Sequence, residues 1–98
     1  VKTSKFPLST RDINIVINKS ISYEEVKSLI SLAGIKHLVS FNLIDIFEGK
    51  DIPKGSVSMT LRFTFQSKTK SLLESEINSS MQMMLKLLEK RLNAKIRS

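Results

Sequence analysis

The chain has 98 residues, enough for one compact domain and too few for two. It contains no cysteine and a single histidine, His37, which argues against disulfides, a thiolate nucleophile, a histidine-based metal site and a catalytic triad. Lysine and arginine total 16 against 9 acidic residues, and the net charge of +7 favours an anionic partner. No apolar run is long enough to span a membrane, and we expect a cytoplasmic location. Because the first residue is Val1 rather than methionine, we expect residues 1–98 to be a single domain cut from a longer chain.

The first elements are a strand and a helix. Residues 13–17 place an isoleucine at every second position, which predicts a strand with one buried face. Ser22 and Glu25 have the spacing of a capping box and predict a helix start. Gly34 is a natural end for that helix, and His37 just after it is expected to be structural.

A second strand is predicted over residues 38–47, an apolar run whose phase changes along its length. A bulge near Asn42 would absorb the change and would turn Ile44 and Ile46 towards the helices. The following segment, residues 49–55, contains two glycines and a proline and is predicted to be a loop between strands.

The second half of the chain begins with the clearest strand. Residues 57–66 alternate strictly between apolar and polar side chains, as in a strand covered on one side only. A second helix is predicted over roughly residues 74–92, with either Ser71 or Leu73 at its N-cap. Residues 94–97 can add a short last strand.

The element order therefore predicts an α+β fold. The predicted order is strand, helix, strand, strand, helix, strand. With right-handed crossovers, this order forms a ferredoxin-like βαββαβ sandwich. Such a sandwich has a four-stranded antiparallel sheet with two helices on one face, and its other face is open to solvent.

Strand parity assigns side chains to this open face. The residues expected there are Asn14, Val16, Asn18, Asp45, Phe47, Ser58, Thr60, Arg62, Thr64, Lys95 and Arg97. RNA-recognition motifs share the topology but stack bases on aromatics of their first and third strands, where this chain has none. The only ring on the face is Phe47, which either stacks on an unpaired base or packs under the loop at 49–55.

Several short segments in a fixed order carry a resemblance to a known family. They are Phe6-Pro7, Arg11-Asp12, Asp45-Ile46-Phe47-Glu48-Gly49, Ile52-Pro53-Lys54-Gly55, Leu61-Arg62-Phe63-Thr64-Phe65 and Lys70-Ser71-Leu72. Together they resemble the ferredoxin-fold anticodon-binding domain at the C-terminus of the bacterial phenylalanyl-tRNA synthetase beta subunit. The resemblance covers nearly the whole chain, from Phe6 to Arg97.

The resemblance implies an RNA site on the open face. It implies that Phe47 lies against the first anticodon base of tRNA-Phe, with Asp45 and Ser58 as hydrogen-bonding neighbours. The family usually has tyrosine in place of Phe47 and arginine in place of Lys70; the first change keeps stacking but removes the phenolic hydroxyl. It also usually has a capping threonine where this chain has Leu73.

The chain itself is expected to bind RNA without performing chemistry. The parent enzyme implied by the resemblance is a phenylalanine-tRNA ligase that uses ATP and magnesium, whereas no catalytic residue, cofactor or metal is expected in this chain. Basic residues expected to approach phosphates are Lys50, Lys54, Arg62, Lys68, Lys70, Lys95 and Arg97.

Expected partners are the anticodon stem-loop of tRNA-Phe, the remainder of the beta subunit and the alpha subunit of a heterotetramer, and no membrane. Two alternatives stay open: an assembly module that barely touches RNA, and a regulatory module that binds amino acids. An acylphosphatase-like enzyme is disfavoured because residues 18–20 offer neither the glycine nor the arginine of a phosphate loop.

Overall fold

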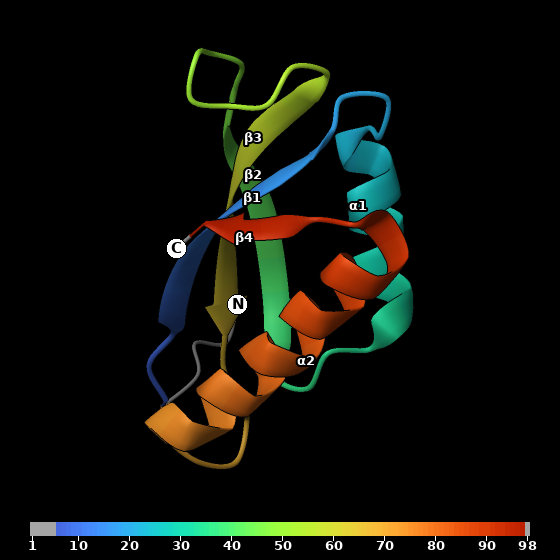
Figure 1. The fold of residues 1–98 in the computed structure, drawn as a ribbon. Helices are drawn as coiled ribbons and strands as arrows, with labels where there is room; N and C mark the ends of the chain where they lie inside the picture. The colour runs from blue at the N-terminus through green and yellow to red at the C-terminus, as the bar shows by residue number, and fades with distance from the viewer. Residues whose placement is uncertain (1–5, 98) are drawn as a thin grey trace.

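Strand β3 (Ser56–Phe65) lies in the interior of the sheet, and its five odd-numbered apolar side chains are each at most 7% exposed. The computed structural model describes residues 6–97, apart from the side chain of Arg97. Antiparallel to β3 run β1 (Ser9–Asn18) on one side and β2 (Leu38–Phe47) on the other. The short β4 (Lys95–Arg97) pairs antiparallel with β1, so that the strand order is β2-β3-β1-β4 (Figure 1).

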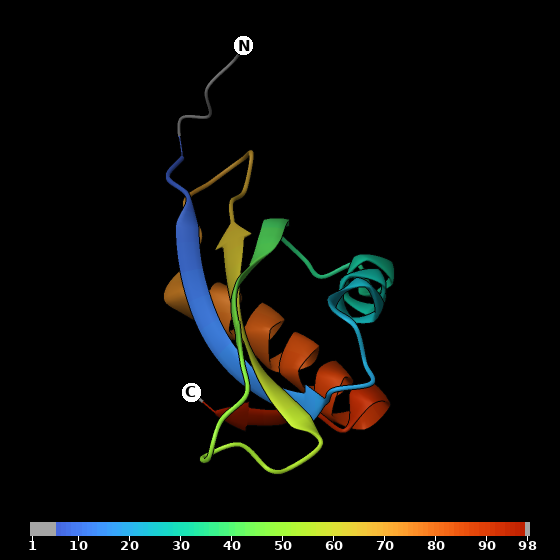
Figure 2. The ribbon, with the colours of Figure 1, turned by 90° about the horizontal axis from the view of Figure 1, so that it is seen from above.

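Helices α1 (Tyr23–Ala33) and α2 (Glu74–Leu92) cover one face of this sheet (Figure 1), and α2 crosses the strands obliquely (Figure 2). Their buried side chains, among them Val26 and Met84, belong to one apolar cluster with the inward residues of β1 and β3. The rings of Phe41 and Phe63 pack within it, 5.9 Å apart between centroids. The predicted ferredoxin-like α+β sandwich is confirmed. Among the described residues, neither helix is long and apolar enough to cross a membrane.

The two helices begin differently. Ser22 caps α1: its hydroxyl accepts the Glu25 N–H at 3.3 Å and its own N–H donates to the Glu25 carboxylate at 3.4 Å, completing the predicted capping box. At α2 the N-cap is Leu73, whose N–H donates to the Glu76 carboxylate at 2.9 Å. A leucine side chain offers no acceptor, so only half of a capping box is present there.

The connection from α1 to β2 uses two left-handed residues. Gly34 ends α1 with φ 62°, as predicted, and His37 follows with φ 66°. The carbonyl of His37 accepts the Gln66 N–H at 3.0 Å, which ties the turn to the end of β3. A structural role for His37 agrees with this position.

The prediction for β2 was wrong in detail. Instead of one bulge near Asn42, β2 has two register shifts against β3, which leave Val39 and Ile44 without paired residues. Ile44 is 46% exposed rather than turned towards the helices, whereas Ile46 lies opposite the buried Met59 but is still half exposed. An edge strand accommodates such bulges because only one of its sides must keep its hydrogen bonds.

Candidate nucleic-acid interface

The strand registers arrange the open face in rows that run across the sheet. One row, which we call the ring row, contains Phe47, Ser58, Val16 and Lys95 on β2, β3, β1 and β4. The next, the carboxylate row, contains Asp45, Thr60, Asn14 and Arg97. The structure therefore brings the predicted residues Phe47, Ser58 and Asp45 into one corner of the sheet.

Phe47 is the last residue of β2 and is 53% exposed. It lies on the face opposite the helices, so the helices do not bury its ring. The tip of the ring lies next to Gly49, whose α carbon carries no side chain to obstruct it. The structure thus combines the two predicted environments: the ring touches the start of the loop and keeps about half of its surface in solvent.

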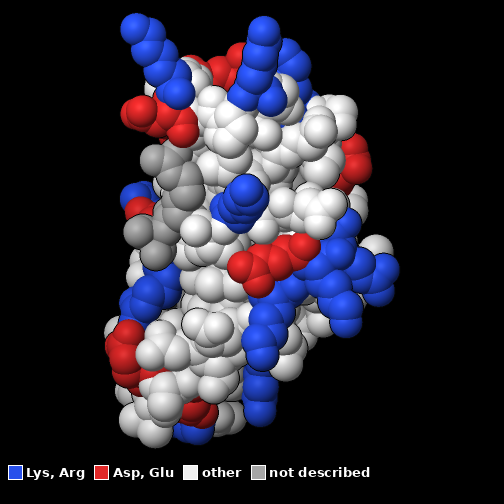
Figure 3. Space-filling model, in the orientation of Figure 1, with Lys and Arg blue, Asp and Glu red and all other residues white. Residues whose placement is uncertain are grey.

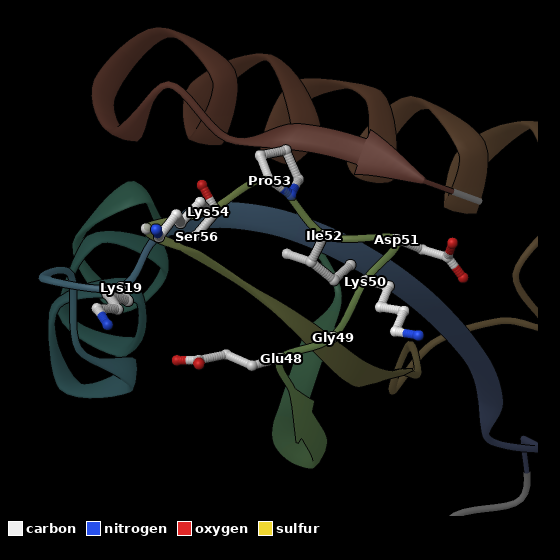
Figure 4. A pocket seen from close by; sticks show the side chains of 10 residues that line it. Lys19, Glu48, Gly49, Lys50, Asp51, Ile52, Pro53, Lys54 and Ser56 are labelled. Carbon is white, nitrogen blue, oxygen red and sulfur yellow. The ribbon is translucent and has the colours of Figure 1, made fainter.

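The β2–β3 loop buries a different apolar side chain. Ile52 is 6% exposed and lies outside the main core cluster, as does the 5% exposed Val16 of the ring row. Pro53, the neighbour of Ile52, lines a hollow together with Val16 and Lys95, which places this part of the loop over the open face. Figure 4 shows Ile52 beneath the loop, whereas Lys50 and Asp51 point away from it.

Two turns give the loop its shape. The Ile52 N–H donates to the Gly49 carbonyl at 3.0 Å, and the Ser56 N–H donates to the Pro53 carbonyl at 3.0 Å. The second turn contains Gly55 at φ 87°, the left-handed position that a type II turn requires. A third bond, from the Lys19 N–H to the Gly55 carbonyl at 2.9 Å, ties the loop to the end of β1.

Ser58 and Val16 are covered by this arrangement, contrary to the prediction that both are open. Ser58 is 5% exposed, and its hydroxyl donates to the Asn14 side-chain oxygen at 2.9 Å. The Asn14 amide in turn donates to the Thr60 hydroxyl at 3.0 Å. The alternation of side chains along each strand placed these residues on the correct face. Alternation carries no information about a loop that folds back over that face.

Asp45 is exposed and lies opposite Thr60, two residues before the ring on the same strand face. Side chains two apart on a strand are separated by roughly 7 Å, which is close to the width of a nucleobase. A base stacked on the ring can therefore present its polar edge to this carboxylate. Hydrogen bonds from N–H groups would satisfy it.

Arg62 is already engaged within the protein. Its guanidinium donates two hydrogen bonds to the Asp12 carboxylate, from Nε at 2.9 Å and from Nη2 at 3.1 Å. This bidentate contact, with the positive charge beside it, holds the pKa of Asp12 below its usual value and raises the pKa of Arg62. The net charge of the pair is zero, so Arg62 can attract a phosphate only through its remaining N–H groups.

Lys70 is not part of the same corner. It follows the end of β3 away from Ser58, and the strand from Ser58 to that end at Phe65 is roughly 23 Å long. Lys70 forms an ion pair with Glu76 in the first turn of α2. The pKa of Glu76 is lowered mainly by the hydrogen bond from Lys70, and to a smaller extent by the hydrogen bond from the Leu73 N–H.

Of the remaining predicted cations, Lys50, Lys54 and Lys95 lie around the corner, whereas Lys68, like Lys70, follows β3 at its far end. Lys50 is exposed in the loop, and Lys95 is exposed at the β4 end of the ring row, roughly 14 Å from Phe47 across three strand spacings. Arg97 pairs with Asn14 through the backbone of β4, and its side chain lies outside the described part of the structure. On the face seen in Figure 3, basic side chains project at the end that carries the β2–β3 loop and gather over the C-terminal half of α2.

Sequence reasoning missed three residues of this corner: Asn14 as the hydrogen-bonding hub, Ile52 as the loop anchor and Gly49 beneath the ring. An isoleucine-proline pair inside a polar loop is the one local signal that indicates an anchor. Within residues 6–97, no group of three histidine or acidic side chains is arranged to hold a metal ion.

The fold, with both helices on one side of an antiparallel β2-β3-β1-β4 sheet, places the chain in the class of ferredoxin-like sandwiches. Comparison with known families narrows the class further. The model of the family described as "Ferredoxin-fold anticodon binding domain" matches residues 4–97, and the chain belongs to this family.

Curated relatives agree with that assignment. The chain is 34% identical over 94 residues to the phenylalanine–tRNA ligase beta subunit of Streptococcus pyogenes and 36% identical over 94 residues to that of Shewanella oneidensis. Both alignments cover 96% of this chain. The beta subunit of Clostridium acetobutylicum is 32% identical over 93 residues. The chain spans 12% of the length of these relatives.

Proposed function

We propose that this domain binds the anticodon stem-loop of tRNA-Phe and contributes to tRNA recognition by a phenylalanine-tRNA ligase. The observation that carries the proposal is the half-exposed Phe47 ring at the end of β2, on the face that the helices leave open. Base–aromatic stacking contributes about 1–3 kcal/mol per base, and one exposed ring beside a carboxylate suits a single splayed base. The catalytic activity, with its ATP and magnesium, belongs in this proposal to other parts of the ligase.

The polar residues of the corner take different roles in the proposed complex. Asp45 accepts hydrogen bonds from the base edge, for which the N1–H and N2–H₂ groups of a guanine are suitable donors. Ser58 has its donor occupied by Asn14, so only the lone pairs of its hydroxyl remain for RNA. Lys50 and Lys95 approach the phosphates on either side of the ring, and Arg62 and Lys70 contribute less because carboxylates already pair with them.

The experiment compares two variants of neighbouring residues with equal exposure. Phe47→Ala should weaken binding of a tRNA-Phe anticodon stem-loop RNA by about 1–3 kcal/mol in a fluorescence anisotropy titration. Ile46→Ala is the matched control because Ile46 is also 53% exposed but lies opposite Met59, on the helix side of β2. Equal affinities of the Phe47 variant and the native domain would remove the stacking role. Equal binding to a hairpin with an unrelated loop would reduce the proposal to nonspecific RNA binding.

The assembly alternative has an observation of its own. Between α1 and α2 lies a groove of about 560 Å³ with an apolar floor, and two of its lining residues, Leu32 and Met83, are 86% and 63% exposed. Three cations, Lys86, Lys90 and Arg91, line it as well. An apolar groove with a basic rim fits a segment that is apolar and acidic. We therefore propose that the remainder of the beta subunit, or the alpha subunit, docks there while the opposite face binds RNA.

The full-length beta subunit, purified with its alpha subunit, tests the docking proposal. Replacing Leu32 and Met83 together by lysine should speed release of this domain by limited proteolysis, because the groove would no longer accept apolar side chains. Leu8→Lys is the control, since Leu8 is 59% exposed and lies outside the groove. An unchanged proteolysis rate in the double variant would contradict docking through the groove.

A further inference from the structure

Gly49 lies so close under the Phe47 ring that a side chain at residue 49 would displace the ring. A β carbon on residue 49 would lie 2.5 Å from the ζ carbon of the ring and 2.7 Å from one of its ε carbons. Real β carbons do not approach other atoms so closely. The other two glycines differ, because Gly34 and Gly55 have positive φ angles and open space around them. Gly34 and Gly55 are therefore glycines for backbone reasons, whereas Gly49 leaves space for the ring.

We propose that Gly49 is a positioning residue for base stacking: its missing side chain lets the tip of the Phe47 ring rest on the loop backbone. This inference rests on the proposed function, because it concerns the orientation of the ring that the RNA base contacts. A ring supported at its tip presents the same exposed surface beside Asp45 before RNA arrives. Such preorganisation lowers the entropy lost on binding.

The loop, rather than the ring, is the fixed partner in this contact. The Gly49 carbonyl accepts the Ile52 N–H at 3.0 Å, and Ile52 is 6% exposed beneath the loop. A methyl group at residue 49 would therefore be relieved by movement of Phe47, which is half exposed and can rotate about χ1. In another rotamer the ring would no longer stand where a base can stack on it next to Asp45.

A double-mutant cycle on stem-loop binding tests the inference. Phe47→Ala should reduce affinity about 5- to 150-fold, and Gly49→Ala should account for a substantial part of that loss although the ring is retained. In the Phe47→Ala background, Gly49→Ala should change affinity by less than about twofold, because no ring remains to be displaced. The loop control is Asp51→Ala, which should bind as the native domain does.

Nuclear Overhauser effects in the free domain give an independent readout. Contacts between the Phe47 ring protons and the Gly49 α protons are expected, and thermal unfolding of Gly49→Ala should match that of the native domain. Two results would overturn the inference but leave the proposed function intact. One is the absence of ring–Gly49 contacts, and the other is native affinity in Gly49→Ala while Phe47→Ala binds more weakly. Native affinity in Phe47→Ala would instead overturn the proposed function, whatever the ring–Gly49 contact shows.

Discussion

Ser58→Ala separates a structural hydroxyl from an RNA-contacting one. In the folded domain Ser58 is 5% exposed and its hydroxyl donates to Asn14 at 2.9 Å. Removing the hydroxyl leaves the Asn14 oxygen in a part-buried site without that donor, a loss of about 1–3 kcal/mol in unfolding free energy for fully buried groups. Because Asn14 is only half-buried, water can partly replace the donor, and we expect about 1–2 kcal/mol.

Urea unfolding measures this loss as a lower midpoint with an unchanged slope. Ser56→Ala, two residues before Ser58 on β3, is the control, because no hydrogen bond of the Ser56 side chain is found among the described residues. A cycle with Asn14→Ala should give a coupling of about 0.5–1.5 kcal/mol between the two side chains.

The affinity for the stem-loop RNA should fall less in Ser58→Ala than in Phe47→Ala, since the hydroxyl points into the sheet face rather than to solvent. Native stability combined with a tenfold or larger loss of affinity would show that the hydroxyl contacts RNA. That result would refute the reasoning from burial and hydrogen bonding.

Three further predictions concern the caps, the ion pair and the loop. Leu73→Ser should raise the unfolding free energy by about 1 kcal/mol in urea, because serine adds a side-chain acceptor for the Glu76 N–H, which now donates only to the Leu73 carbonyl at 3.0 Å; an unchanged unfolding free energy would contradict the description of a half-formed capping box. Arg62 lowers the pKa of Asp12, so the native domain should be more stable than Asp12→Asn. The difference in unfolding free energy should be full above the pKa of Asp12 in the unfolded chain, about 3.9, and should be lost as the pH falls through its lower pKa in the folded domain. Thermal melts at pH 7 and 2.5 check this, and an equal advantage at both would refute it. Ile52→Ala should lower stability by about 2 kcal/mol and speed proteolysis in the loop; native resistance would mean that the loop has no anchor.

Local patterns predicted the elements well because each carries its own signal. The Ser22–Glu25 capping box gives the start of α1, and the strict alternation along β3 identifies which side chains enter the core. Phe47 and Asp45 were placed on the open face correctly despite the error about β2, since the bulge lies at Ile44, before both of them. Without the shift at Ile44, Phe47 would lie opposite the buried Val57 and its ring would turn towards the helices.

The cover over the open face could not be predicted from these patterns. Val16 and Ser58 are both buried on this face, and the loop that lies near Val16 is distant in sequence from β1. Loop folding leaves no periodicity in the strand that it covers. The same limit applies to charge: Arg62 was assigned to the correct face, but its pairing with Asp12 depends on the β1–β3 register. Register-dependent contacts of this kind decide which basic residues remain free for phosphates.

The half-exposed ring also determines how binding should respond to salt. Full burial of a phenylalanine side chain contributes about 1.5–3 kcal/mol, so a ring that is 53% exposed leaves roughly half of this, about 1–1.5 kcal/mol, to be gained when a base covers it. This apolar gain releases no counterions, whereas each phosphate contact does. Phe47→Ala should therefore lower affinity by the same factor at 50 mM and at 200 mM salt, whereas Lys50→Ala should reduce the slope of log K against log salt by about 1. A Phe47 effect that shrinks with added salt would mean that the ring acts by placing phosphates rather than by stacking on a base.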